Sequence, residues 1–580
     1  MTIKLNLLAL LVGVVGGLGS WAFRRLIEGF FFLFVDIPRA SLPAQASWLP
    51  FLLAPAAGGL LVGVLTSKVS AETRGHGVPE VLEAVALRSG RMNARVPFVK
   101  IVASAATIGS GGSAGREGPI AQIGAGFASV LGQRLRLRDQ ELRTLVVAGV
   151  CGGISATFNA PIGGFLFAVE VFFRQTTVSF FIPLMVSSVA GAVTGQLVLG
   201  TSLAFNGFPA VPFVDDYGTL PALALLGLAT GVASAGFIKF FYATEDSLQR
   251  LAKRFNVPPV AFSVLGGSLV GLILLATYLV AGEDWRSFTT AGMTYEPIEK
   301  IFSGKLLEGP VGAVAGVLLL MFALKVLATS LTLGSGGSGG VFAPSLFLGA
   351  TLGGIFGAAF SAVGLVEASH VPVFALAGMA GFFVGVGRAP ATAIVIVAEM
   401  TGDYLLTVPL MVVVAVSFVV SRVLERQDIY VAKLARRGVF ARGFFVPLLA
   451  SVRVRKVMTT VDRLVALDAN DTVGKALELI EQSNHEGFPV LSDGRVVGVL
   501  EVAKAFPQLL EVPKESRLGD HLPSGNHVVH VSPDDDLERV VDLMEAEGAS
   551  KLPVVAQGKL VGWLTHSDVV RGYKRAAAAN

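Results

Sequence analysis

The residues with the clearest chemistry form a glycine-rich segment at positions 109–119, which ends in Gly-Arg-Glu-Gly-Pro. Pro119 precedes an apolar run, and proline is favoured in the first turn of a helix. The first N–H groups of a helix have no partner within it and carry the positive end of its dipole. They would point back at the glycine-rich segment and form an anion site that needs no basic side chain.

A second glycine-rich segment lies in the later half of the apolar region, at positions 334–344, and ends in Gly-Val-Phe-Ala-Pro. A proline followed by a glutamate is also repeated, because Pro161 precedes Glu170 and Pro390 precedes Glu399. Matching interruptions in two halves are typical of transporters with internal repeats, whose substrate sites lie at the ends of broken helices. Glycines also serve tight helix packing, but two long aligned copies favour a repeated site.

Acidic residues are scarce in the apolar part of the chain, where Glu117, Glu170 and Glu399 are the clear ones. A cation pathway would need carbonyl groups or intramembrane carboxylates, whereas the glycine-rich segments offer N–H groups. The pattern therefore favours an anion as the ligand. Glu117 could also serve only to satisfy a helix dipole. Glu170 and Glu399 resemble buried carboxylates that pair with backbone at repeated positions.

Membrane helices must position these segments. Of 580 residues, 53% are hydrophobic and 15% charged, and the mean hydropathy is +0.68. Soluble globular chains carry about 25% charged residues, so a soluble enzyme, a nucleic-acid binder and a disordered protein are excluded. We expect the net charge of +4 to come from Lys and Arg in cytoplasmic loops. Cys151 is the single cysteine, which excludes an intrachain disulfide.

Apolar runs follow one another from about residue 3 to residue 425. Several reach the roughly 20 residues that a helix needs to cross a bilayer. Shorter runs broken by glycine lie between them, and such helices are tolerated at membrane depth when they are buried in protein or line a cavity. We expect the first run to be a retained helix, because no small-residue cleavage site follows it. The pattern predicts a transport protein rather than an anchor.

The composition changes after about residue 452, where charged residues become frequent and the long apolar runs stop. The segments at positions 487–500 and 551–564 correspond to each other, and each is expected to form two short strands after a helix. A tandem repeat of this kind indicates two units that bury their faces against each other. The sequence therefore predicts a soluble α/β region at the C-terminal end.

Three motifs resemble, in order, the signatures of the CLC chloride channels and proton-coupled chloride exchangers: Gly-His-Gly-Val-Pro at 75–79, residues 115–119 and residues 340–344. Tyr430 lies where this family places its central-site tyrosine. The C-terminal repeat resembles the paired cystathionine-β-synthase (CBS) domains that many members carry. The resemblance implies an all-α polytopic membrane protein, with an inverted repeat and broken helices, plus a cytosolic α/β tandem CBS domain. It also implies a homodimer, each subunit with its own anion pathway.

The resemblance sets the expected domain limits. These are a transmembrane domain at 1–438 with repeats at roughly 49–200 and 258–425, a linker at 439–453, and a CBS pair at 454–580 with copies at 454–512 and 518–573. We expect a multi-pass protein of a prokaryotic inner membrane, with the CBS domains in the cytoplasm.

The resemblance also assigns roles to individual residues. Glu117 would be the external gating glutamate, whose carboxylate competes with the anion for the helix N-termini until protonation releases it. The N–H groups of Val341 and Phe342 would donate to the central anion, and that of Gly118 to an outer site. Tyr430 would donate its hydroxyl, although a tyrosine at such a position can also be an interfacial anchor.

Arg116, beside the gating position, would shape the field at the outer mouth. Two positions depart from the family pattern. His76 replaces the usual serine, and its ring could donate to the anion and add a charge near neutral pH, or rotate away and leave a backbone N–H in its place. Val171 stands where exchangers generally carry a proton-relay glutamate. We therefore predict voltage- or pH-gated passive conduction of chloride or another small monovalent anion, with proton-coupled exchange as the alternative.

Thr565 and Asp568 match the nucleotide-binding pattern of CBS domains, in which the aspartate accepts ribose hydroxyls and the threonine reaches phosphate. Glu501 and Lys504 replace them in the first copy. The resemblance implies at most one site for ATP, ADP, AMP or cyclic di-AMP, or a domain that dimerises without ligand. We expect no required cofactor and no nucleic-acid partner.

Two other classes of protein are weighed against this prediction. A CBS-bearing divalent-cation channel would need carboxylates at the pore and lacks the anion motifs. An intramembrane enzyme would need a serine–histidine pair, a catalytic aspartate motif or a zinc-binding histidine cluster within the bundle, and the sequence has none of these. We therefore predict that the chain is not an enzyme.

Overall fold

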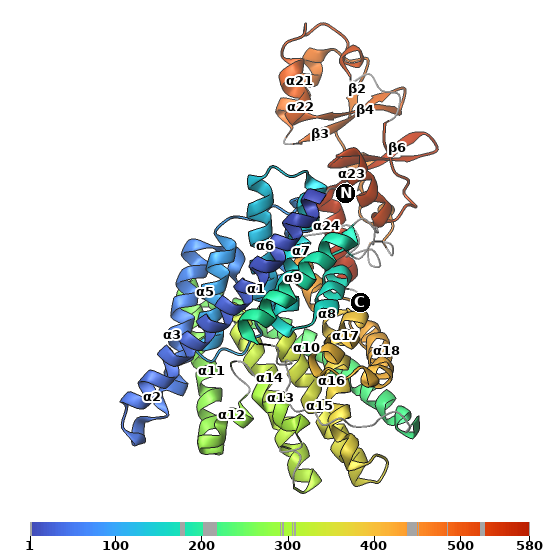
Figure 1. Cartoon of the computed structure of the whole chain (residues 1–580). Helices are drawn as coiled ribbons and strands as arrows, with labels where there is room; N and C mark the ends of the chain where they lie inside the picture. Colours follow the sequence, from blue (N-terminus) through green and yellow to red (C-terminus); the bar gives the residue numbers. More distant parts are fainter. Residues whose placement is uncertain are drawn as a thin grey trace. The chain divides into compact units, whose positions relative to one another are not determined.

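The computed structural model (Figure 1) describes residues 3–173, 180–200, 217–289, 292, 295–303, 306, 309–437, 449, 452–483, 485–522 and 528–578. The chain divides into two compact units, Met1–Arg436 and Arg437–Asn580. Most of the expected linker at 439–453 lies outside the described residues.

Within the described residues, the first unit has ten apolar helical spans long enough to cross a membrane. Their main helices are α1 (Ile3–Phe31), α3 (Leu49–Val64), α7 (Asp139–Phe158), α9 (Phe181–Leu199), α10 (Leu220–Arg254), α11 (Pro259–Ala281), α14 (Val311–Gly334), α15 (Phe342–Ala362), α16 (Val371–Gly387) and α18 (Thr407–Leu424). The other α-helices named in the first unit are α2 (Ile37–Ser41), α4 (Val78–Leu87), α5 (Val96–Gly109), α6 (Glu117–Arg134), α8 (Pro161–Ala168), α12 (Trp285–Phe288), α13 (Tyr295–Phe302), α17 (Pro390–Thr401) and α19 (Ile429–Arg436).

The two sequence repeats carry the same backbone irregularities. Gly111 and Gly336, at corresponding positions of the two glycine-rich segments, have φ angles of +105° and +106°. Asn159 and Arg388 end α7 and α16 in the left-handed region, with φ angles of 55° and 57°. Each of these two helices is followed by a short helix with proline in its first turn, α8 or α17. The repeat found in the sequence is therefore also present in the backbone structure.

The centre of the first unit is built from small residues. Helix α16 is buried along its whole length, whereas α11 and α14 expose many of their leucines. Helices α15 and α16 pack backbone against backbone, because a Cβ at Gly349 or Gly353 would collide with the main chain at Gly378 or Phe374. Close approach through small residues is the usual basis of helix packing in membranes.

The second unit holds all the strands named in the described residues, in two three-stranded sheets of order β1–β6–β5 and β2–β3–β4. The strands are β1 (Thr459–Thr460), β2 (Leu467–Asp468), β3 (Gly487–Ser492), β4 (Arg495–Glu501), β5 (Lys551–Ala556) and β6 (Lys559–Thr565), with helices α21 (Val473–Gln482), α22 (Val502–Leu509), α23 (Leu537–Glu547) and α24 (His566–Ala578). Both antiparallel hairpins shift register at equivalent points, Val490/Leu491 and Val554/Val555. The predicted fold class, a polytopic helical part plus a small α/β part, is confirmed.

Candidate anion-binding site

The three glycine-containing motifs meet in one backbone cluster. Gly115 N donates to Gly340 O at 2.7 Å, and Gly340 N donates to Gly115 O at 2.6 Å. Gly75 N donates to Gly337 O at 3.0 Å, and Gly339 N donates to Gly75 O at 3.2 Å. The segments that precede α4, α6 and α15 are thus joined by main-chain hydrogen bonds, although they lie far apart in the sequence.

Each glycine-rich segment is anchored on a helix of the other repeat. Ser113 N donates to Thr332 Oγ1 on α14 at 3.0 Å, and Ser338 N donates to Thr107 Oγ1 on α5 at 3.1 Å. The two bonds join equivalent positions of the repeats in opposite directions. A buried N–H without a partner is costly in a membrane, so these reciprocal bonds fix the path of both segments.

Glu117 is the first residue of α6 and is buried, with 1% of its surface exposed. Its Oε2 accepts a hydrogen bond at 3.4 Å from the N–H of Ala343, in the first turn of α15. The carboxylate therefore lies at the N-terminus of a helix from the other repeat. This is where the sequence predicts an anion to bind, because unsatisfied N–H groups and the helix dipole favour negative charge there.

The predicted backbone donors surround this position. Val341 is the N-cap of α15 and Phe342 its first residue, and both are buried. The Phe342 ring packs against Phe383, with ring centroids 4.3 Å apart, and against Phe158 at 5.0 Å. Gly118 has no room for a side chain, since a Cβ would lie 3.1 Å from Gly340 Cα and closer still to a carbonyl oxygen.

Tyr430 is buried on α19, where Asp428 caps the helix by accepting hydrogen bonds from Tyr430 N at 3.0 Å and Val431 N at 2.9 Å. A Cβ at Gly387 would lie 3.6 Å from Tyr430 Cε2 and 3.1 Å from Phe383 Cε2. Since Phe383 also contacts Phe342, the structure brings α19 to the region of the α15 N-terminus.

His76 is buried, and its imidazole packs against helix α10. The ring meets Phe241 edge to face, with centroids 5.4 Å apart and planes at 69°, and lies 6.5 Å from the Tyr242 ring. The carbonyl of His76 faces Gly118. Main chain and side chain of this residue therefore contact different elements, the main chain α6 and the ring α10.

Arg116 is the N-cap residue of α6, and its guanidinium donates to the carbonyl of Thr157 near the C-terminus of α7 at 3.3 Å. The carbonyl end of a helix attracts positive charge. This contact orients the arginine side chain toward α7.

Val171 is buried within a single π-helical turn, η5 (Val169–Phe173). The residue before it, Glu170, caps α17: its carboxylate accepts from Ala391 N at 2.9 Å and from Thr392 N at 2.8 Å, and from the Thr392 hydroxyl at 2.6 Å. The position next to Glu170 thus carries no titratable group, and the carboxylate of Glu170 is engaged with backbone.

Glu399 on α17 makes the equivalent contact in the opposite direction. It accepts from Ile162 N at 3.0 Å and from Gly163 N at 2.6 Å, at the start of α8. The predicted pairing of Glu170 and Glu399 with backbone is therefore present, and it crosses between the repeats. Each acid caps a short helix of the opposite repeat.

Two buried lysines were not predicted. Lys100 on α5 has 0% exposure and donates to Thr73 O at 3.1 Å and Gly75 O at 2.8 Å. Lys325 on α14 is equally buried, with Nζ 5.3 Å from the centroid of the Phe347 ring, and it interacts electrostatically with Glu117. The two lysines occupy equivalent positions of the repeats, so an alignment on the glycine-rich segments would have found them.

Thr565 and Asp568 lie together at the start of α24 in the second unit. The buried carboxylate of Asp568 accepts from Thr565 N at 2.9 Å and from Thr565 Oγ1 at 2.6 Å, and it forms an ion pair with Arg571. The side chain of Lys504 lies outside the described residues. The predicted nucleotide ligands are brought together, but both carboxylate oxygens already have partners.

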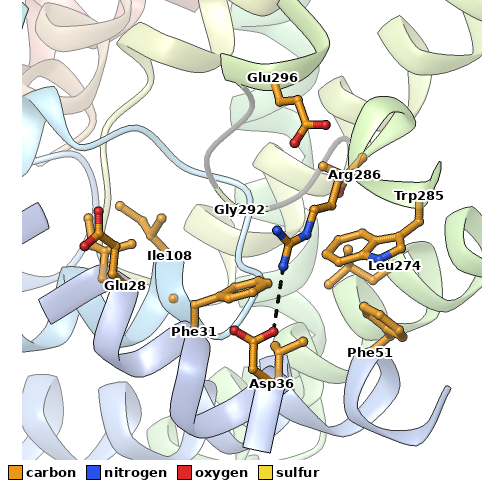
Figure 2. A pocket seen from close by; sticks show the side chains of 15 residues that line it. Glu28, Phe31, Asp36, Phe51, Ile108, Leu274, Trp285, Arg286, Gly292 and Glu296 are labelled. Carbon is orange, nitrogen blue, oxygen red and sulfur yellow. Dashed lines mark ion pairs between the residues drawn. The ribbon is translucent and has the colours of Figure 1, made fainter. Parts of the chain in front are cut away.

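Two cavities lie away from the predicted ligands. One of about 650 Å³ in the second unit is lined by β4, α22 and the start of β5, including Glu501 but neither Thr565 nor Asp568. One of about 360 Å³ in the first unit has aromatic walls from Phe31, Phe51 and Trp285. Figure 2 shows Asp36 facing Arg286 across it, 3.7 Å apart. Neither cavity contains a predicted anion ligand.

Comparison with known proteins identifies the family. The family model described as "Voltage gated chloride channel" matches residues 58–422, and the CBS domain model matches residues 454–504 and 524–575. A chloride channel protein described as ClcB-like, from Ralstonia nicotianae, is 31% identical over 434 residues, covering 73% of this chain and 95% of that protein. The H⁺/Cl⁻ exchange transporter ClcA of Vibrio cholerae is 30% identical over 438 residues, covering 74% and 88%.

Solved structures share the fold. A eukaryotic CLC transporter matches with a TM-score of 0.69 and 20% identity, covering 98% of both chains. A slow cyanobacterial Cl⁻/H⁺ antiporter matches with a TM-score of 0.65 and 23% identity, covering 75% of this chain and 98% of that one. The glycine-rich motifs joined around Glu117 lie within the matched range, and the chain is a multi-pass membrane protein that belongs to the CLC (voltage-gated chloride channel) family and carries two CBS domains.

Proposed function

We propose that the first unit carries chloride or another small monovalent anion and that Glu117 gates the pathway. The supporting observation is the contact of the Glu117 carboxylate with Ala343 N at the start of α15. The N–H groups proposed for the anion, those of Val341 and Phe342, lie at the same helix N-terminus, where two negative charges repel each other. Protonation removes the negative charge, so the side chain releases the site and the anion enters it.

The proposed ligands of the anion come from several elements. The N–H groups of Val341 and Phe342 serve a central position, that of Gly118 serves an outer one, and the Tyr430 hydroxyl donates from α19. Burial strengthens each bond, because no water competes there. His76 joins them through its backbone while α10 holds its ring, an arrangement that follows from the aromatic contacts of the ring.

We infer passive conduction rather than coupled exchange. A proton crossing an apolar stretch needs a titratable side chain or an ordered water path, because an uncompensated charge is costly there. Val171 offers no such group, and the neighbouring Glu170 is engaged with the start of α17. Proton-coupled exchange is the second candidate, and the relatives described as H⁺/Cl⁻ exchange transporters favour it.

The remaining assignments are part of the same proposal. The chain functions as a homodimer in a prokaryotic inner membrane, with the CBS pair in the cytoplasm. Transport needs no cofactor, and an adenine nucleotide at Thr565 and Asp568 regulates it.

Purified full-length protein in liposomes tests the function, with chloride efflux and proton movement measured together. We expect chloride efflux that increases at acid pH, and no uphill proton movement when a chloride gradient is imposed. Uphill proton movement at a fixed ratio to chloride would make the protein an exchanger. Absence of anion flux from both acid and neutral vesicles would refute anion transport itself.

A further inference from the structure

Tyr242 on α10 lies between two of the proposed anion ligands. Its side chain is buried, and its hydroxyl donates to the carbonyl of Ile429, the residue before Tyr430. On the other side, the centroid of its ring lies 6.5 Å from that of His76. A single side chain thus contacts both the helix that carries Tyr430 and the ring at the family's serine position.

The same turn of α10 holds His76 from a second direction. Phe241 meets the imidazole edge to face at 5.4 Å and meets Tyr242 at 5.1 Å, with planes at 85°. Edge-to-face pairs are favourable beyond the area they bury. The three rings form one packed group, which restricts rotation of the imidazole.

The following turn of α10 binds α19 by charge. Glu245 is buried and forms an ion pair with Lys433, and Gln249 Nε2 donates to the same carboxylate at 3.2 Å. Asp246 pairs with Arg436 at 2.5 Å. Arg436 also lies over the Tyr242 ring, 4.5 Å from its centroid. Helix α19 is therefore held on α10 at both ends, by the Tyr242 hydroxyl at its start and by ion pairs farther along.

We propose that Tyr242 is a positioning residue for the central anion site, acting through Tyr430 and His76. The hydroxyl of Tyr430 must lie within about 2.5–3.0 Å of an acceptor to form a good hydrogen bond, so a small shift of α19 weakens the bond. The Tyr242–Ile429 bond fixes the first turn of α19, next to the ligand. This inference rests on the proposed function, since it takes the anion site as given.

Tyr242→Phe tests it, because the variant removes the hydroxyl and keeps the ring. Loss of one such hydrogen bond should weaken chloride binding by about two- to tenfold. The half-saturating chloride concentration rises by the same factor, while the maximal flux changes by less than about twofold because Glu117 and its helix are untouched. Tyr278→Phe is the matched control, since that hydroxyl bonds to Ser47 on another part of the unit at 3.2 Å.

Two further variants keep the test independent of one substitution. Tyr242→Leu also removes the ring, so we expect an additional change in the nitrate-to-chloride selectivity. In a chain that already carries His76→Ser, Tyr242→Leu should cause no such change in selectivity. Lys433→Glu should weaken chloride binding, and combination with Glu245→Lys should restore it. Restoration would show that the α10–α19 contact, rather than either charge alone, positions the site.

Calorimetric chloride binding to the purified full-length chain separates the two proposals. If the wild-type chain binds no chloride, the proposed function fails and this inference fails with it. If the wild type binds and conducts chloride but Tyr242→Phe matches it in binding, half-saturation and selectivity, only the positioning role is overturned.

Discussion

In the proposed gate, the Glu117 carboxylate lies at the N-terminus of α15, where it accepts from Ala343 N, next to the N–H groups of Val341 and Phe342 that would bind the anion. Because negative charge holds the carboxylate there, protonation favours the anion. Anion flux should therefore increase as the pH falls through the range in which Glu117 takes up its proton. This dependence belongs to one carboxyl group and should disappear with it.

Glu117→Gln should therefore give chloride flux that is independent of pH between about pH 4 and pH 8, at or above the wild-type level at the upper end. An amide is isosteric with the carboxyl group but neutral throughout this range. Chloride efflux from liposomes measures it, with Glu367→Gln, at an exposed carboxylate, as the control. A variant that keeps the full pH dependence of the wild type would exclude Glu117 as the gate.

Lys325 is fully buried on α14 and interacts electrostatically with Glu117. Lys325→Met removes the amine and keeps a side chain of similar length, so we expect the pH dependence of chloride flux to change. Lys325→Arg keeps a basic group at this position and should retain the wild-type pH dependence. Chloride efflux from liposomes measures both variants, and an unchanged pH dependence in Lys325→Met would exclude the electrostatic link.

The glycine motifs and Glu117 could be predicted from the sequence because each motif has a local pattern: glycines, then a proline, then an apolar run. The ring contacts of His76 could not, since its partner Phe241 lies on a helix far along the chain and no periodicity joins them. Lys100 and Lys325 fall between these cases. Their equivalent places in the two repeats are visible in the sequence, but each looks like an isolated charge.

At the scale of elements, hydropathy predicts length well. The apolar region expected from about residue 3 to residue 425 begins with α1 and ends with α18. Hydropathy does not predict partners, and the crossed capping of α8 and α17 depends on partners alone. Glu170 and Glu399 were expected to bind backbone, yet their spacing does not reveal that each binds the helix of the other repeat.

Because each glutamate caps a helix of the opposite repeat, removing either carboxylate should lower the stability of the protein. Glu170→Gln and Glu399→Gln each replace an acceptor of two N–H groups by an amide that accepts less well and brings its own donors. Each should lower the free energy of unfolding by about 1–3 kcal/mol, with the larger loss for Glu170, which also accepts from the Thr392 hydroxyl. Thermal unfolding in detergent measures it, with Glu367→Gln as the control. Unchanged midpoints in both variants would contradict the capping role.

At the scale of the whole molecule, a nucleotide at the proposed CBS site must compete with contacts that the protein makes within itself. The Asp568 carboxylate is already engaged by Thr565 and Arg571, so a ribose must displace these partners. We expect adenine nucleotides to bind weakly to the full-length chain, and about tenfold more weakly in Asp568→Asn. Calorimetry with ATP, ADP, AMP and cyclic di-AMP measures both. No heat from any of them would leave only a ligand-free role in dimerisation.

The reciprocal anchoring of the two glycine-rich segments also constrains how the protein is made. Ser113 finds its partner Thr332 only after 219 further residues have been synthesised. At a translation rate of about 5–20 residues per second, that delay is about 10–40 s. Until then, the first segment has polar groups that lipid cannot satisfy. The reciprocal bonds between the two segments, and with them the proposed anion site, can therefore form only after the later half of the membrane unit has been synthesised.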